Sequence, residues 1–191
     1  EEHISGIPGD DFIKEFLPKC SESEKSQIAK EFVKFKERCL VRLLGDMRSY
    51  NYVIIPTHDF DKIIYKIRAI DFDQQSFEGN LKVYNLQFLK ENFKIVDMVN
   101  RKLDNNSINQ YKLEERSFMA KRMISSPRRA SSLIECMKND SISFDHNIQL
   151  LKKQLIKYVG DVKFKECQNM GDILETILVF VKRNYQDVLT K

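Results

Sequence analysis

The sequence predicts a mainly α-helical fold that carries one small β-hairpin, an α+β arrangement in a single domain, residues 1–191. Three observations lead to this expectation. Apolar residues recur at helical spacing through most of the chain, two neighbouring runs near residue 60 are rich in β-branched and aromatic residues, and no segment after Val83 resembles a strand. A chain of 191 residues is long enough to bury a core of its own without disulfides or metals.

Composition and charge exclude several classes of protein. A formal net charge of +4 is too mild for a nucleic-acid binder, and no apolar run approaches the roughly 20 residues that span a membrane. The acidic start of the chain is no secretory signal. The four cysteines, Cys20, Cys39, Cys136 and Cys167, form no C-x-x-C pair, so we expect reduced thiols in a cytoplasmic protein. From the charge and the hydropathy we expect neither nucleic acid nor membrane as a partner.

The first 45 residues are expected to form helices that lead into a loop at Asp46. Asp10 or Asp11 can cap a short helix through Leu17, which Pro18 closes. Ser21 and Glu24 then have the spacing of a capping box, which opens a longer helix.

The longer helix is amphipathic. Its apolar residues recur at steps of three and four and define one stripe, made of Ile28, Phe32, Phe35, Cys39 and Leu43. The charged residues between them are expected to face water, namely Lys25, Lys30, Glu31, Lys34, Lys36 and Glu37. Gly45 suits the left-handed conformation that often ends a helix.

Residues 46–80 are expected to hold a loop, a hairpin and a polar connection. Tyr52–Ile55 and Ile63–Ile70 read as strands, and 56–61 as the turn that contains His58, a solvated turn residue. If the strands pair, Asn51 at the start of the first and the residue after the second, Asp71, lie near Asp46. Two carboxylates and an amide oxygen suit a hard cation such as Mg²⁺ better than zinc.

Residues 81–191 are expected to form a helical subdomain. The expected helices run from near Asn85 to before Asp104, from a cap at Ser107 to Ser125, around Ala130–Met137, from a cap at Ser143 to Gly160, and from about Met170 onward. The densest basic patch, Lys121, Arg122, Arg128 and Arg129, is interpreted as a solvated helix start.

Two motifs in residues 43–78 resemble those of the protein-kinase-like superfamily. Asp46 followed by Asn51 has the D-x-x-x-x-N spacing of its catalytic loop. The segment Ala69–Asp73, which reads AIDFD, resembles its metal-binding D-F-G element. Gly45 before Asp46 is closest to the loop of aminoglycoside and choline kinases.

The resemblance implies a C-terminal kinase lobe and a role for each motif residue. Asp46 would accept the proton of a substrate hydroxyl, and Asn51 and Asp71 would hold Mg²⁺ on the phosphates of ATP. Arg48 would lie near the transferred phosphate. Asp73 would be an extra metal ligand or a capping residue.

The sequence also departs from this family. Leu44 stands where a His is expected and Asp73 where a Gly is expected, and neither a Gly-rich phosphate loop nor a lysine-bearing strand precedes the catalytic loop. The resemblance therefore covers the C-terminal lobe without the N-terminal lobe. We expect one of two explanations. Either this chain is a fragment of a longer protein and is inactive alone, or something other than an N-terminal lobe covers the nucleotide.

Two functions follow from these observations. The first is an ATP- and Mg²⁺-dependent phosphotransferase that acts on a hydroxyl of an unidentified small-molecule or protein acceptor. The alternative is a non-catalytic domain, either pseudokinase-like or a helical interaction domain, which the departures favour.

Overall fold

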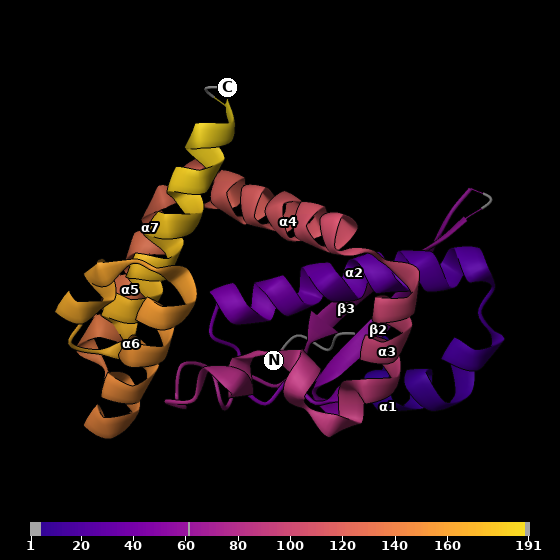
Figure 1. Ribbon diagram of the computed structural model, residues 1–191, viewed down its shortest axis with the longest axis horizontal. Helices are drawn as coiled ribbons and strands as arrows, with labels where there is room; N and C mark the ends of the chain where they lie inside the picture. Colours follow the sequence, from indigo (N-terminus) through magenta and orange to yellow (C-terminus); the bar gives the residue numbers. More distant parts are fainter. Residues whose placement is uncertain (1–4, 61, 190–191) are drawn as a thin grey trace.

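The computed structural model describes residues 5–60 and 62–189 and confirms a mainly helical fold with a small antiparallel sheet (Figure 1). Helix α2 (Glu22–Val41) crosses the middle of the molecule. The sheet and α3 (Phe93–Lys102) lie on one side of it, and α4 (Asn105–Ser125) packs against it as well. Helices α5 (Pro127–Asn139), α6 (Asp145–Val159) and α7 (Met170–Leu189) gather at the far end.

The first elements are shorter and less regular than the sequence predicts. Strand β1 (Ile7–Pro8) leads into α1 (Gly9–Asp11), a π-helical turn η1 (Phe12–Phe16) and a 3-10 turn η2 (Leu17–Lys19). No aspartate caps this segment, because the residue before α1 is Pro8 and it makes no capping side-chain bond. Phe12 in η1 is buried in the core, which anchors the segment despite its irregular backbone.

Helix α2 begins at the predicted capping box. The Glu24 backbone donates to Ser21 Oγ at 3.2 Å, and the Ser21 backbone donates to Glu24 Oε2 at 2.8 Å. All five residues of the predicted apolar stripe are buried, as their helical spacing requires.

The polar face of α2 contains one residue that the sequence misplaces. Glu37, expected in water, is 1% exposed and pairs with Arg116 Nε of α4 at 2.5 Å. The difference arises from tertiary packing, because α4 covers part of the face of α2 that the sequence predicts to be exposed to solvent.

Arg38 ties α2 to two other elements. Its guanidinium lies 2.7 Å from Glu31 and 3.2 Å from Glu115 of α4, and it donates to the Ile67 carbonyl at 3.1 Å. Burial opposes the charge on Arg38, but the two carboxylates outweigh it and raise its pKa. The hairpin, α2 and α4 are therefore joined through one side chain.

The hairpin is longer than predicted. Strands β2 (Tyr52–Asp59) and β3 (Lys62–Ala69) pair from Tyr52↔Ala69 to Asp59↔Lys62, so the expected turn residues from Pro56 on belong to β2. Among the described residues, β1 pairs only with Val53 and Ile54, so Pro56 has no β1 partner on that edge of β2, where a proline is tolerated. Phe60 marks the turn with a φ of 52°, and Asp61 lies outside the described residues.

Short 3-10 turns replace the start of the first predicted C-terminal helix. They are η4 (Leu81–Tyr84), η5 (Leu86–Phe88) and η6 (Lys90–Asn92), and α3 begins only at Phe93. A further 3-10 turn, η7 (Val162–Glu166), separates α6 from α7.

The remaining predicted helices are confirmed, but two caps are wrong. Asp104, not Ser107, caps α4, because its side chain accepts from the Ser107 backbone at 2.7 Å. Phe144 precedes α6, and the predicted cap Ser143 instead donates to the Phe77 carbonyl. Gly160 ends α6 with a φ of 78°, as predicted.

The core has two hydrophobic clusters, and α2 contributes to both. Phe32 and Cys39 join the sheet and α3 in the first cluster, while Val41 and Leu43 join α4, α6 and α7 in the second. The end of α2 therefore lies where the two clusters meet. Within the part of the chain that the structure describes, no helix is long and apolar enough to cross a membrane.

Replacing Arg116 by Met should lower the free energy of unfolding by about 3 kcal/mol, because Glu37 would stay buried without a countercharge. Urea denaturation measures this loss. Lys121→Met, which removes an exposed charge from the same helix, should change stability by no more than about 0.5 kcal/mol. Equal effects of the two substitutions would contradict the importance of this buried pair.

Candidate functional site

The candidate site begins where α2 ends. The Leu44 backbone donates to the Cys39 carbonyl at 2.8 Å, and the Leu43 backbone to the Leu40 carbonyl at 3.2 Å. These two bonds form a Schellman motif whose left-handed residue is Leu43, with a φ of 50°. The prediction that Gly45 would take this conformation is wrong.

Gly45 is needed for a different reason. A Cβ on this residue would lie 2.6 Å from the Gln74 carbonyl oxygen, so the two segments approach too closely for any side chain. The loop after α2 and the segment after the hairpin are therefore in direct backbone contact. An isolated bridge between Leu44 and Gln75 joins the same two segments.

Asp46 and Asn51 are brought together as their spacing predicts. Asp46 has a φ of 52°, and its carbonyl accepts from the Arg48 backbone and from Asn51 Nδ2, both at 2.7 Å. Its carboxylate accepts from Arg48 Nε at 2.7 Å and keeps about a third of its side-chain area in solvent, 32%. The Asn51 side chain thus fixes the backbone that presents the Asp46 carboxylate.

Backbone strain is concentrated at this loop. Four non-glycine residues within 5–60 and 62–189 have a positive φ: Leu43, Asp46, Ser76 and the hairpin residue Phe60. Two of them are linked directly, because the Ser76 backbone donates to the Leu43 carbonyl at 2.8 Å, and the buried Ser76 Oγ has no partner there. Residues in such conformations, which cost about 1–3 kcal/mol each, cluster at functional sites.

Two residues of η6 complete the loop, and nothing in the sequence marks them. Arg48 reaches Glu91 at 3.3 Å as well as Asp46, and its pKa is raised chiefly by the hydrogen bond to Asp46, then by the charges around it. Asn92 is fully buried, donates to the Met47 carbonyl at 3.0 Å, and accepts from the Tyr52 hydroxyl at 3.0 Å. The loop is therefore held from outside the motif as well as within it.

Asp71 lies next to this loop through the hairpin. The Ile70 backbone donates to the Asn51 carbonyl at 3.1 Å, which extends the strand pairing by one residue and places Asp71 just beyond it. The Asp71 carboxylate accepts from the Asp73 backbone at 3.0 Å, a local turn. The exposed Asp73 side chain has no hydrogen bond within the described chain.

The donor set of the site is chemically suited to Mg²⁺. The Asn51 nitrogen donates to the Asp46 carbonyl, which leaves Asn51 Oδ1 as a possible metal ligand. One Asp71 oxygen accepts from the Asp73 backbone, and the other remains as a second possible ligand. Among the described residues no group of three or more His, Cys, Asp or Glu is placed to hold a metal. Mg²⁺ is commonly held by one or two carboxylates together with substrate phosphates and waters, and this set fits that pattern.

The comparisons with known proteins give no family. The chain matches no protein-family model, no curated protein and no solved structure. The kinase-like interpretation therefore depends on the motifs of residues 43–78 and on their geometry.

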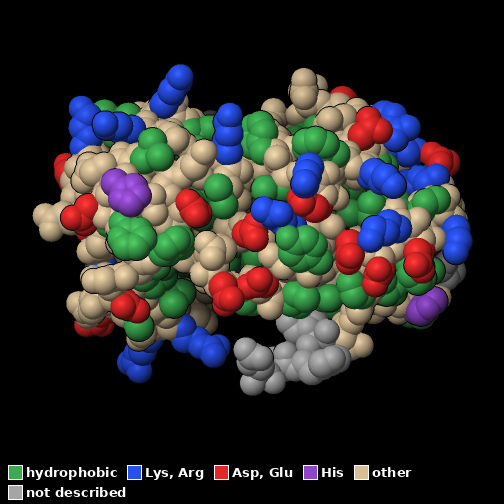
Figure 2. Space-filling view, turned by 90° about the horizontal axis from the view of Figure 1, so that it is seen from below, with side chains coloured by type: hydrophobic (Ala, Val, Ile, Leu, Met, Phe, Trp, Pro, Cys, Tyr) green, Lys and Arg blue, Asp and Glu red, His purple; other side chains and the backbone are tan. Residues whose placement is uncertain are grey.

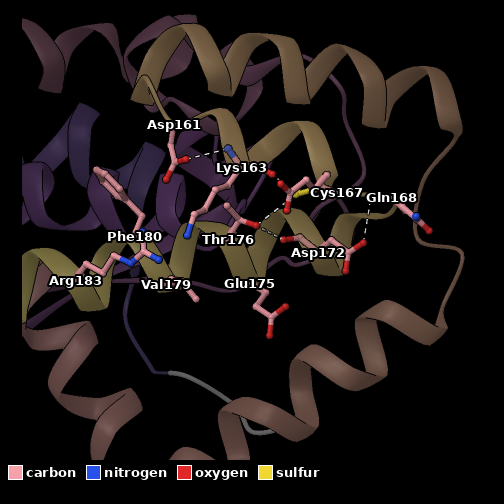
Figure 3. A pocket seen from close by; sticks show the side chains of 11 residues that line it. Asp161, Lys163, Cys167, Gln168, Asp172, Glu175, Thr176, Val179, Phe180 and Arg183 are labelled. Carbon is pink, nitrogen blue, oxygen red and sulfur yellow. Dashed lines mark hydrogen bonds between the residues drawn. The ribbon is translucent and has the colours of Figure 1, made fainter.

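A separate cavity of about 370 Å³ lies between η7 and α7 (Figure 3). The Cys167 thiol lies 3.3 Å from the Thr176 hydroxyl at one end, and burial raises the pKa of this thiol. Lys138 lies 3.3 Å from Asp172 and 2.6 Å from Glu175. A protonated thiol is a poor nucleophile, and the nearby Asp172 and Glu175 are ion-paired with Lys138, so this cavity does not suggest a catalytic site.

The histidine and the arginines that the sequence predicts to be solvated are exposed. His58 is exposed on the hairpin, and Arg128 and Arg129 are exposed at the start of α5. None of them lines the cavity between η7 and α7.

Replacing the buried Asn92 by Leu should lower the free energy of unfolding by about 3 kcal/mol, because the Tyr52 hydroxyl and the Met47 carbonyl would lose their partner inside the core. Chemical denaturation measures the loss. Asn100→Leu on the exposed face of α3 is the matched control. An Asn92→Leu protein as stable as the parent would show that this network does not hold the loop.

Proposed function

We propose that this chain is the nucleotide- and metal-binding part of an ATP- and Mg²⁺-dependent phosphotransferase with a kinase-like C-terminal lobe. The observation that carries the proposal is the contact between Asn51 and Asp46. A strained aspartate, held by the asparagine five residues later, has its carboxylate directed to an accessible surface. The bond from the Ile70 backbone to the Asn51 carbonyl supports the proposal further, because it leaves Asp71 one residue beyond the strand pairing next to Asn51.

The proposed role of each residue comes from the resemblance to the kinase-like catalytic loop. Asp46 orients the acceptor hydroxyl and takes its proton, while the hydroxyl oxygen bonds to the γ-phosphorus and the bond to the leaving ADP oxygen breaks. Arg48 is held beside Asp46 by Glu91 and contributes a positive charge where the transferred group is expected. Rate enhancement then comes mainly from positioning and charge neutralisation.

Asn51 and Asp71 are the residues that would hold Mg²⁺, with Asp73 as a further oxygen ligand. When bound, the ion would neutralise charge on the β- and γ-phosphates of ATP. Asn51 can serve both the metal and the loop, because its nitrogen donates to the Asp46 carbonyl while its Oδ1 accepts no hydrogen bond among the described residues.

A second candidate is a non-catalytic binding domain. It is supported by the buried Leu44 in place of a histidine and by the ion pair in which Arg48 already occupies the Asp46 carboxylate. In this alternative the loop is a rigid scaffold, and neither Asp46 nor Asp71 would affect a reaction.

Asp71→Asn should weaken the binding of Mg²⁺-ATP by at least about tenfold and leave the melting temperature unchanged, because the substitution removes a metal ligand from a solvent-accessible turn. Isothermal titration calorimetry measures the affinity. Asp59→Asn, on the exposed hairpin, is the control and should bind as the parent does. Parental affinity in Asp71→Asn would remove the metal assignment.

The substitution Asp46→Asn distinguishes the two candidate functions, the phosphotransferase and the non-catalytic binding domain. In the full-length protein it should lower phosphoryl transfer by about 10²–10⁴-fold while Mg²⁺-ATP still binds, because the proton acceptor is lost and the proposed metal ligands Asn51 and Asp71 remain. Transfer of γ-³²P to candidate acceptors gives the readout. Nucleotide binding without any Asp46-dependent transfer would favour the non-catalytic domain.

A further inference from the structure

A second cavity, of about 490 Å³, lies between the N-terminal turns and α3. Its walls come from η1, η2, the first turn of α2 and one face of α3. Its volume falls in the range of small-molecule pockets, about 300–1,000 Å³. The residues of the proposed phosphotransferase site are absent from its lining, so any ligand here is independent of that function.

The floor of this cavity is apolar. Ile13 and Leu17 from the N-terminal turns and Met98 from α3 are all buried, with exposed fractions of 5%, 8% and 6%. Pro18 lines the same surface. A hydrocarbon chain laid on this floor would leave water without displacing polar groups.

The rim is basic. Lys25, Lys94, Arg101 and Lys102 line the cavity with only two acidic residues, which gives the rim a net charge of +2. At the right of Figure 2, Lys and Arg side chains are interspersed with Asp and Glu around hydrophobic ones, so the basic excess belongs to the cavity lining and not to this whole end of the molecule. The cavity of Figure 3 has the opposite balance, with four acidic and two basic lining residues.

Three of these four cations are already paired. Glu22 binds both Lys25 and Lys102, and these bonds lower its pKa to about 2, so it stays charged. Asp97 pairs with Arg101 at 2.6 Å. Lys94 has no carboxylate within ion-pair distance among the described residues, so an anion can bind it without breaking an existing pair.

We propose that this cavity binds a small amphipathic anion of the fatty-acid type. Its apolar chain lies on Ile13, Leu17 and Met98, and its carboxylate pairs with the ammonium of Lys94. The single available cation suits one negative charge, and the cavity volume suits a short chain rather than a peptide helix, which would need an extended groove.

The six methionines of the chain provide a site-specific test by NMR. With ¹³C-methyl-methionine labelling, titration with decanoate below its micellar concentration should shift the Met98 methyl resonance saturably and leave that of Met170, in the α7 cluster, unchanged. Decyltrimethylammonium and decanol, which match the chain but lack the negative charge, should bind at least about fivefold more weakly. Met98→Leu assigns the resonance.

The substitution Lys94→Glu should weaken decanoate binding by about fivefold or more. Lys90→Glu, an equal charge change at the exposed Lys90 of η6 outside the cavity lining, should leave binding as in the parent. Three results would overturn the proposal: no saturable Met98 shift with decanoate, equal affinity for all three amphiphiles, or a Met98 shift with an acidic amphipathic peptide but not with decanoate. Because Asp46 and Asp71 take no part, the Asp71→Asn protein should bind decanoate normally.

Discussion

The way in which α2 ends is the constraint on which the candidate site depends. Leu43 accepts a left-handed backbone, which costs about 1–2 kcal/mol outside glycine, and its side chain is fully buried in return. A glycine here would relieve the strain but would leave a hole where the two core clusters meet. The chain therefore reverses sharply at a fixed point, and Asp46 follows three residues later.

The elements around this turn make it rigid. Arg38 joins α2 to the hairpin and to α4, and Asn92 joins the loop to η5 and to the core hydroxyl of Tyr52. Polar side chains buried in this way are stabilising when all their partners are present and costly when one is missing. A site that must hold its groups in one geometry benefits from such support, and here the support comes from elements distant in the sequence.

Some of the site was predictable from local sequence. The stripe from Ile28 to Leu43 follows from helical periodicity, the hairpin from its β-branched residues, and the meeting of Asp46 and Asn51 from their spacing. Local sequence is enough to predict these features because each depends on residues close together in the chain.

Other features depend on packing that no local pattern reveals. Local sequence predicts a solvated Glu37 because its partner helix α4 is distant in the chain. It predicts a turn at Pro56 because it does not reveal how few residues of β2 pair with β1. The sequence predicts a helix-end role for Gly45, whereas the close approach of the Gln74 carbonyl is what requires a glycine there. Glu91 and Asn92 stand among ordinary polar residues and become part of the site only through the fold.

In the proposed site Asn51 and Asp71 hold one nucleotide-bound cation beside Asp46, and a paramagnetic ion tests this arrangement most directly. Mn²⁺-ATP in place of Mg²⁺-ATP should broaden the ¹³C-methyl resonance of Met47, the neighbour of Asp46, much more than that of Met137 in α5, and Asp71→Asn should abolish the difference. Broadening that is uniform across the methionines, or a Met47 resonance that responds equally in the Asp71→Asn protein, would contradict the account.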